Sequence, residues 1–373
     1  METRVDFVQS LQSDMSVNIL ACLNDPVDVV HAGSVSSLWH HFVITNGISK
    51  QLCLRRFPQL SGIERITEPD WITTETNGVG SHNSSWDIMK RDHNVYASLL
   101  HAITTLNTCQ SECIAYAVSA SSTDRFPAES VANTLTTRRY LGGHSYCSSK
   151  GHADPDAPET LIYKLKADLC VISKISVQPF EAFYQPGQPI YSAKSVRFRL
   201  GHPKNSLDEN DIVQMPQRQP ADDKFIWTYT SEVYPMEQKN CLQQFKLPEP
   251  VLCIGGYLQI ELLGRVQRQH SDDFVSHVKV MGGPLCPAFD IDILEPSGKF
   301  ALKYNPEVFR WMLQSFSEDS IISPMPSEEE VVEHVGVMGF LLQAYHGGIE
   351  PMVWDEPMEW DDDDEEMDEL GIL

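Results

Sequence analysis

The sequence lacks the features on which several large classes of protein depend. Its most apolar stretch, VLCIGGYLQI, is ten residues long and too short to span a bilayer. The opening METRVDFVQS contains acids and no apolar region, so we expect no secretory signal. Neither a G-x-G-x-x-G fingerprint nor a phosphate-binding loop occurs. The sequence therefore predicts neither a membrane partner nor a nucleotide-binding enzyme.

Basic residues are scarce. The chain has 28 Lys and Arg against 52 Asp and Glu, which gives a formal net charge of −24. Residues 350–373 hold 12 acids and no base, and residues 317–335 hold six acids and no base. The acidity therefore belongs to the C-terminal end, where it predicts a disordered tail, and it excludes nucleic acid as an expected partner.

Paired cysteine spacings are also missing. The nine cysteines are scattered and odd in number, which is typical of reduced and mostly buried thiols. Together with the expected lack of a secretory signal, they predict an intracellular protein of the nucleus and/or cytoplasm.

What the chain does contain near its start is a set of short helices. Ser13 or Asp14 is expected to cap the first, Asp25 is a good N-cap for the next, and Pro26 suits a first helical position. Gly33 should end that helix. Apolar residues recur at helical spacing on each segment: Met15, Ile19, Leu20 and Leu23, then Val35, Leu38, Trp39 and Phe42.

Beyond residue 114 the period of the apolar pattern changes from 3.6 to 2. In TLIYKLKAD, Leu161, Tyr163 and Leu165 alternate with lysines, and SVRFRL, FIWTYTS, YLQIELL and HVKVMG repeat the pattern. Such strands, separated by turns and not by helices, predict an antiparallel β-sandwich. A helix over 93–107 should precede them. Later helices should begin at Asn305-Pro306 and at Ser327.

The expected fold class is α+β and multidomain. We predict a helical module over 1–60, a polar linker over 61–92 and the sandwich with its leading helix over 93–300. C-terminal helices over 301–348 and the acidic disordered tail over 349–373 complete the chain.

Several residues were weighed as chemical sites. GHSYC (143–147) resembles a nucleophile elbow but has Cys147 in place of the second glycine, so His144, Ser145 and Cys147 are weak candidates for catalysis. His144, Cys147 and His152 lie close together but lack the paired spacing of a zinc site. Cys109 and Cys113 have the spacing of one helical turn, but no second pair follows them. Asp290 and Asp292 alternate on an expected strand, where acids usually face solvent rather than calcium. We therefore predict no catalytic residues, no metal and no cofactor.

Residues 7–57 resemble an F-box, the helical module that docks a protein to a cullin–RING ubiquitin ligase. The matching residues are Leu11, Ile19, Leu23, Asp25-Pro26, Val29, Val35, Ser36 and Trp39. The usual Leu-Pro at the start of an F-box is Leu11-Gln12 here. The resemblance implies that a SKP-type adaptor binds this module. The residues expected to contact it are Leu11, Met15, Ile19, Leu20, Leu23, Pro26, Val29, Val35 and Trp39.

Residues 110–285 are similar to galactose-binding-like jelly rolls. The segments that match are ASSTDRFPAESVANTL, ETLIYKLKADLCVISKISVQPF and the closing strands around YLQIELLGRV and VSHVKVMG. An F-box followed by this sandwich resembles a plant F-box protein family over most of the chain.

That resemblance implies a non-catalytic substrate receptor of an SCF-type ligase, whose sandwich binds a protein target, glycosylated or not, through residues that the sequence does not identify. The alternatives are an adaptor-bound intracellular lectin or lipid-binding module outside any ligase, and an enzyme that uses residues 144–147. The acidic tail is a further candidate for contact with a basic surface.

Overall fold

The computed structural model of this 373-residue chain describes residues 6–68, 85–106, 110–136, 146–150, 154, 157–204, 221–266, 274–294 and 298–318. No helix within these ranges combines the length and the apolar character needed to cross a membrane. The helix expected at Ser327 and the acidic tail over 349–373 lie outside the described residues.

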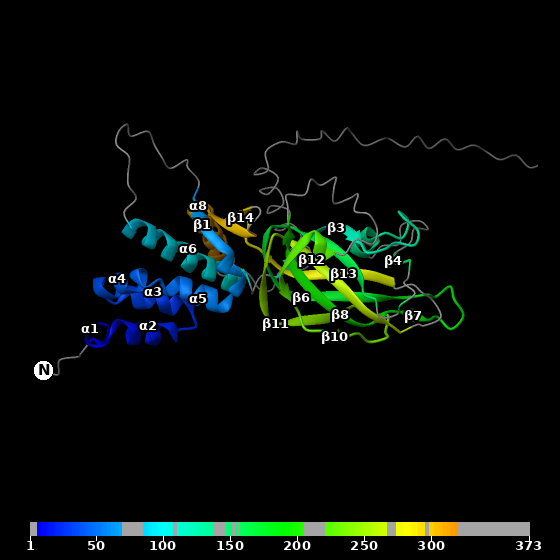
Figure 1. The fold of residues 1–373 in the computed structure, drawn as a ribbon, viewed down its shortest axis with the longest axis horizontal. Coiled ribbons are helices and arrows are strands. Elements are labelled where there is room, and N and C mark those ends of the chain that lie inside the picture. The colour runs from blue at the N-terminus through cyan, green and yellow to red at the C-terminus, as the bar shows by residue number, and fades with distance from the viewer. Residues whose placement is uncertain are drawn as a thin grey trace, which may run out of the picture. The chain divides into compact units, whose positions relative to one another are not determined.

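Short helices form the N-terminal part of the chain and lie side by side (Figure 1). They are α1 (Phe7–Ser10), α2 (Ser13–Ala21), α3 (Pro26–Ser34), α4 (Ser37–Thr45), α5 (Ile48–Arg56) and the longer α6 (Ser85–Leu106), with the 3-10 turn η1 (Pro58–Gly62) after α5.

Two of these helices begin where local chemistry predicts. The Asp25 carboxylate accepts a hydrogen bond from the Val27 backbone N–H at 2.8 Å, and Pro26 is the first residue of α3. The Ser36 hydroxyl oxygen accepts one from the Trp39 backbone N–H at 3.3 Å, which caps α4. These caps allow the chain to turn sharply between short helices.

Two local expectations were wrong. The N-cap of α2 is Gln12, which makes no side-chain cap bond, rather than Ser13 or Asp14. Gly33 does not end α3, which continues to Ser34 because Gly33 lies inside the helix with negative φ. A glycine stops a helix most effectively where the backbone turns left-handed, as Gly47 does before α5 with φ 58°.

The expected polar linker over 61–92 carries regular structure at both ends. Strand β1 (Ile63–Thr67) occupies its start, and α6 begins at Ser85 rather than at residue 93. Helix α6, expected to lead the sandwich, buries Val95, Leu99 and Ile103 in the same cluster as the N-terminal helices. The domain boundaries at 60, 92, 300 and 348 stay predictions.

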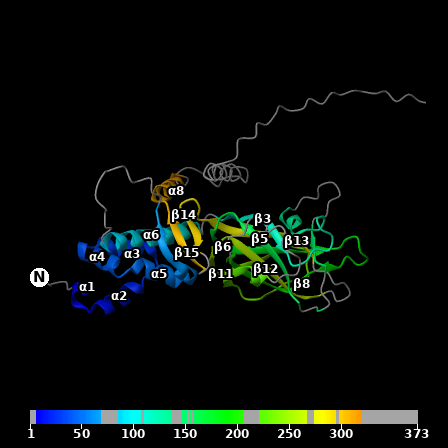
Figure 2. The same cartoon turned by 45° about the horizontal axis from the view of Figure 1, so that its top comes forward.

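A three-stranded sheet joins distant parts of the chain. Its order is β1–β15–β14, where β14 is Phe289–Leu294 and β15 is Lys299–Tyr304. β1 runs parallel to β15, and β14 runs antiparallel to it. Helix α8 (Pro306–Glu318) lies beside β14 and β15 (Figure 2), and its Phe309 ring contacts that of Phe289 at 5.7 Å between centroids.

Two larger antiparallel sheets make the sandwich. The first has the order β10–β8–β12–β5–β3 with β9 also paired to β8: β3 (Ile114–Ala120), β5 (Glu159–Leu165), β8 (Ala193–Pro203), β9 (Phe225–Thr230), β10 (Tyr234–Pro235) and β12 (Tyr257–Arg265). The second has the order β11–β6–β13–β2, with β4 on β13 and β7 on β6: β2 (Ser111–Glu112), β4 (Cys147–Ser148), β6 (Leu169–Glu181), β7 (Ile190–Tyr191), β11 (Gln243–Ile254) and β13 (Phe274–Pro284). The turns η3 (Val131–Leu135) and η4 (Ala221–Asp223) lie in the connections.

The core between the two sheets follows the alternation in the sequence. Buried side chains from alternate positions meet there, among them Leu161, Tyr163 and Leu165 of β5 and Val196, Phe198 and Leu200 of β8. A separate buried cluster unites the helices, the three-stranded sheet and four residues of β6 and β11: Leu169, Val171, Leu252 and Ile254. The expected α+β architecture, a helical module followed by an antiparallel sandwich, is confirmed.

Candidate functional site

The N-terminal helices expose large aliphatic side chains in rows. On α2 and just before it, Leu11, Met15 and Ile19 are 37%, 55% and 46% exposed. Met15 and Ile19, at i, i+4 spacing, lie on one face of α2, and Leu11 stands four residues before Met15. Ser16 and Leu20, about 100° around the helix axis from them, are buried. A helix that buries one face and leaves an aliphatic row on the other is suited to a partner that covers this row.

Not all the predicted docking residues belong to this surface. Leu20 and Val29 are only 4% and 2% exposed, and Pro26 is also buried. Leu20 and Val29 lie in the core that joins the helices to α6. These three residues are therefore buried within the fold, and their contact with an adaptor stays a prediction. An amphipathic stripe does not by itself distinguish the helix face that packs internally from the face that stays exposed.

Trp39 and Leu23 are intermediate. Both pack partly against the buried cluster of the helices. The Trp39 indole N–H donates to the Asp6 carboxylate, with both N···O distances at 3.0 Å. The tryptophan therefore connects the start of the chain to α4 and keeps part of its ring accessible.

Three exposed aliphatic residues extend the surface beyond the predicted set. Val27 and Val30 stand on α3 at i, i+3 spacing, and Leu38 lies in the first turn of α4; Val35, which was predicted, is 64% exposed beside it. The sequence contained a sign of this exposure. The three valines of PVDVV cannot all lie on the single buried face of a helix, so at least one of them must be exposed.

A groove beside α4 interrupts the helical surface. It is lined by Val8, Ser13, Leu38, His41, Phe42, Thr45 and Asn46. His41 stacks on Trp86 of α6 with 4.7 Å between ring centroids, and the Asn46 amide donates to the Phe42 carbonyl at 2.8 Å. The groove therefore has a fixed wall and mixed polarity.

The candidate catalytic and metal residues do not form a reactive site among the described residues. Cys147 is buried, and burial together with Glu159 and Glu129 raises its pKa to about 12, which keeps the thiol protonated. Burial also raises the pKa of Cys113 to about 12. His144, Ser145, His152 and Cys109 lie outside the described residues.

The paired acids of β14 are not arranged as a cation site. Asp292 is ion-paired with Lys303 at 2.7 Å, and burial raises the pKa of Asp290 above its usual value. Within the part of the chain that the structure describes, no group of three or more His, Cys, Asp or Glu residues could hold a metal ion.

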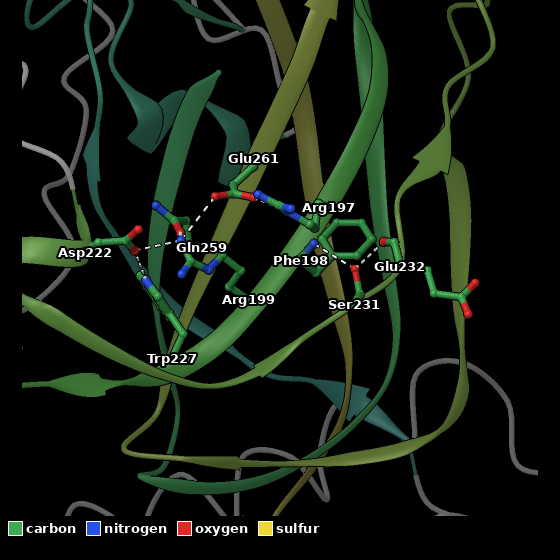
Figure 3. Close-up of polar contacts among 9 residues, drawn as sticks. All are labelled: Arg197, Phe198, Arg199, Asp222, Trp227, Ser231, Glu232, Gln259 and Glu261. Carbon is green, nitrogen blue, oxygen red and sulfur yellow. Dashed lines mark hydrogen bonds and ion pairs between the residues drawn. The ribbon is translucent and has the colours of Figure 1, made fainter. Parts of the chain in front are cut away.

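The outward face of β8 and β12 holds a network of charged side chains (Figure 3). Glu261 of β12 accepts hydrogen bonds from Arg197 Nε and from Arg199 Nη1, the latter at 3.3 Å. Arg199 also donates to Asp222 at 2.7 Å and lies 5.1 Å from the Trp227 ring in a cation–π contact. Because both arginines are paired within the chain, this face is internally satisfied.

The fold defines a class of protein that combines a module of short helices with an antiparallel β-sandwich. No family model matches the chain. The F-box protein At4g00755 of Arabidopsis thaliana is 44% identical over 313 residues, which cover 80% of this chain and 82% of that protein. The chain belongs to this plant family of F-box proteins.

Solved structures match a little under half of the chain. The family 32 carbohydrate-binding module of C. perfringens NanJ, solved with galactose, is 11% identical and covers 47% of this chain and 96% of its own, with a TM-score of 0.28. The corresponding module of Streptococcus pneumoniae EndoD is 9% identical over 45% of this chain and 97% of its own, with a TM-score of 0.30. A fucolectin from Morone saxatilis serum is 12% identical over 46% of each chain, with a TM-score of 0.29. These likenesses concern the fold, and no ligand is inferred from them.

Proposed function

We propose that this F-box protein is the non-catalytic substrate receptor of an SCF-type cullin–RING ubiquitin ligase inside the cell. Its helical module binds the SKP-type adaptor, and its sandwich binds the protein to be ubiquitinated. The observation that carries the proposal is the exposed aliphatic row formed by Leu11, just before α2, and by Met15 and Ile19 on α2.

The chemistry of this row favours a protein partner. Water-exposed aliphatic area contributes about 25 cal/mol per Å² when it is covered, and side chains fixed on a helix lose little further freedom on binding. The other exposed aliphatic residues, Val27, Val30, Val35 and Leu38, belong to the neighbouring helices α3 and α4. We propose that they continue the adaptor surface, with Trp39 and Leu23 contributing their accessible parts.

The sandwich would act through proximity. A receptor that holds a target beside the ubiquitin-charged enzyme converts lysine attack from a bimolecular into a nearly intramolecular step. This role needs binding and orientation but no reacting side chain. The protonated state of Cys147 is consistent with it.

The test is the adaptor affinity of the full chain, measured by titration calorimetry. Met15→Asp and Ile19→Asp place a charge in the aliphatic row, and each should weaken adaptor binding by at least about 2 kcal/mol, a 30-fold loss. Asn94→Asp is the matched control, because Asn94 is exposed on α6 and so lies outside the aliphatic row of α2. The control should bind almost normally.

Equal affinities for the wild type, M15D and I19D would contradict the proposed adaptor surface, provided that circular dichroism shows the variants folded. Co-purification of the wild type with adaptor but without cullin would contradict the ligase role. That second result would favour an adaptor-bound binding module outside a ligase.

A further inference from the structure

The outward face of the second sheet carries lysines on three adjacent strands. Lys246 of β11 is directly opposite Lys174 of β6, and Lys174 is opposite Met281 of β13. In the next row, Gln244, Ser176 and Lys279 lie opposite one another in the same strand order. Lys174, Lys246 and Lys279 are named here the lysine face.

These lysines point away from the sandwich core. Their strand neighbours Ile175, Phe245 and Val280 are buried in that core, and side chains alternate between the two faces of a strand. Farther along the same outward face, Val171 and Leu252 are covered in the cluster that includes the helices. Beyond that covered part, Lys246 is exposed and Lys174 and Lys279 are partly exposed, while the small Ser176 between them is buried.

None of the three lysines forms a hydrogen bond or an ion pair in the described part of the chain. Other lysines there do have partners: Lys164 pairs with Asp168, Lys239 with Glu237 and Lys303 with Asp292. Outside the acidic segments 317–335 and 350–373, the chain has 34 acids and 28 bases, so acidic partners are available in principle. The acid nearest in register is Glu112 of β2, which lies opposite Met281 and one strand beyond Lys174.

An unpaired lysine row is unfavourable for the isolated protein. Like charges directly opposite one another on paired strands destabilise a sheet, and Lys246 and Lys174 are such a pair. An anionic segment laid over them would remove this repulsion. The charge arrangement therefore favours an acidic occupant over a neutral one.

The spacing of the lysines suits an extended peptide. Cβ atoms of directly opposite residues are about 4.5–5.5 Å apart, and those of diagonal neighbours such as Lys174 and Lys279 are about 7–8 Å apart. Alternate residues of an extended peptide are separated by about 6.6 Å and point the same way. Carboxylates at every second position can therefore each approach one lysine.

We propose that the lysine face binds an acidic segment of a partner protein, in extended form, across β11, β6 and β13. That this partner is the ubiquitination target rests on the proposed function; the binding itself does not. The interaction is mainly electrostatic, so it accelerates association and weakens as salt rises.

The experiment measures binding of a fluorescein-labelled octapeptide of alternating Glu and Ser to the full chain by fluorescence anisotropy, at low and at physiological ionic strength. The same peptide with Gln in place of Glu is the ligand control. The variant K174Q/K246Q/K279Q should bind the Glu peptide at least about 10-fold more weakly at low salt. The wild type should prefer the Glu peptide over the Gln peptide.

The matched control is K194Q/K239Q/K303Q, which makes the same change in net charge at three exposed lysines elsewhere in the sandwich and the three-stranded sheet. Its affinity should stay within about twofold of wild type. Equal losses in the two triple variants, or no preference for Glu over Gln, would overturn the proposal. Both variants must first show cooperative unfolding.

Two further measurements test whether the lysine face binds the chain's own acidic terminus or a membrane instead. Deletion of residues 355–373 should leave the peptide affinity unchanged; a large gain would assign the lysine face to the chain's own acidic terminus and overturn the proposal. Binding to phosphatidylserine vesicles without binding to the peptide would overturn it in favour of a membrane. Adaptor affinity is measured separately, so failure of the docking module and failure of the lysine face are distinguishable.

Discussion

The two outward faces of the sandwich both carry cations but use them differently. On β8 and β12, Arg197 and Arg199 are paired with Glu261 and Asp222, and Glu261 is almost fully buried. On β6, β11 and β13, the lysines have no acidic partner among the described residues. The comparison separates charge that holds the fold together from charge that is available to a partner.

The residue types fit this division. Arginine presents several N–H donors in a rigid plane, so one side chain can satisfy several acceptors at a crowded site, as Arg199 does with Asp222, Gln259 and Glu261. Lysine carries a compact, strongly hydrated charge on a flexible stem, so it is stable in water without a partner and can still pair with an anion that binds. We therefore expect substitutions on the paired arginine face to lower the free energy of unfolding. Substitutions on the lysine face should change stability little and weaken the binding of an anionic partner.

The largest effect should come from breaking the paired face. Glu261→Ala leaves Arg197 and Arg199 without their shared carboxylate in a mostly buried setting, and the free energy of unfolding in urea should fall by about 3 kcal/mol. Asp292→Ala, which breaks the exposed pair with Lys303, should cost at most about 1 kcal/mol. Similar losses in the two variants would remove the distinction between structural and surface pairs.

The same contrast between inward and outward residues applies to α2. Leu20→Ala should lower the free energy of unfolding by about 2–3 kcal/mol, because it opens a cavity in the shared core of the helices and α6. Ile19→Ala should change stability by less than about 1 kcal/mol but weaken adaptor binding. An Ile19→Ala protein with lower stability and normal adaptor affinity would reverse the assignment of the two faces.

Acid should weaken the junction between α5 and α6. Burial, with a smaller contribution from His40, lowers the pKa of His93 below its ordinary 6.5, and Ser49 contacts its Nδ1 at 3.1 Å. The unfolded chain therefore binds the His93 proton more readily than the folded chain does. Stability should fall as the pH drops below about 6.5 and level off below the lowered pKa. Unfolding curves of the wild type and His93→Asn, each measured at pH 7.5 and pH 5, test this, and the loss of stability at pH 5 should be smaller in the variant. The same loss in both proteins would exclude His93 as its source.

The smallest effect on stability is expected on the unpaired face. Lys174→Gln and Lys246→Gln should leave the free energy of unfolding within about 0.5 kcal/mol of wild type, with a slight gain at low salt because the cross-strand repulsion is relieved. Chemical denaturation at two salt concentrations measures this. A loss comparable to that of Glu261→Ala would mean that these lysines are structural.

Local patterns predicted much of this protein. The alternation in TLIYKLKAD and SVRFRL identified residues that the sandwich core buries, and Asp25-Pro26 identified the start of α3. These predictions succeed because the two-residue period of a strand and the unsatisfied N–H groups of a first helical turn act over a few residues. The F-box resemblance likewise rests on short-range spacing.

Long-range pairing was beyond such patterns. Nothing local in IERIT indicates that Ile66 lies beside Leu302, or that α6 packs with the N-terminal helices instead of leading the sandwich. For the same reason, the sequence did not show that Leu20, Pro26 and Val29 are buried within the fold. A helix shows its apolar positions in sequence, whereas the neighbour that covers them is chosen by the rest of the fold.

By itself, the sequence determined the element types, the module order, the inward positions of the strands and the concentration of acid toward the C-terminal end. These follow from periodicity, capping and composition, which need no knowledge of distant contacts. The tertiary structure decided which aliphatic residues of α2 and α3 stay exposed, and which cations meet carboxylates and which do not. Those outcomes depend on strand register and helix packing, where residues far apart in the chain become neighbours and compete for the same water-free space.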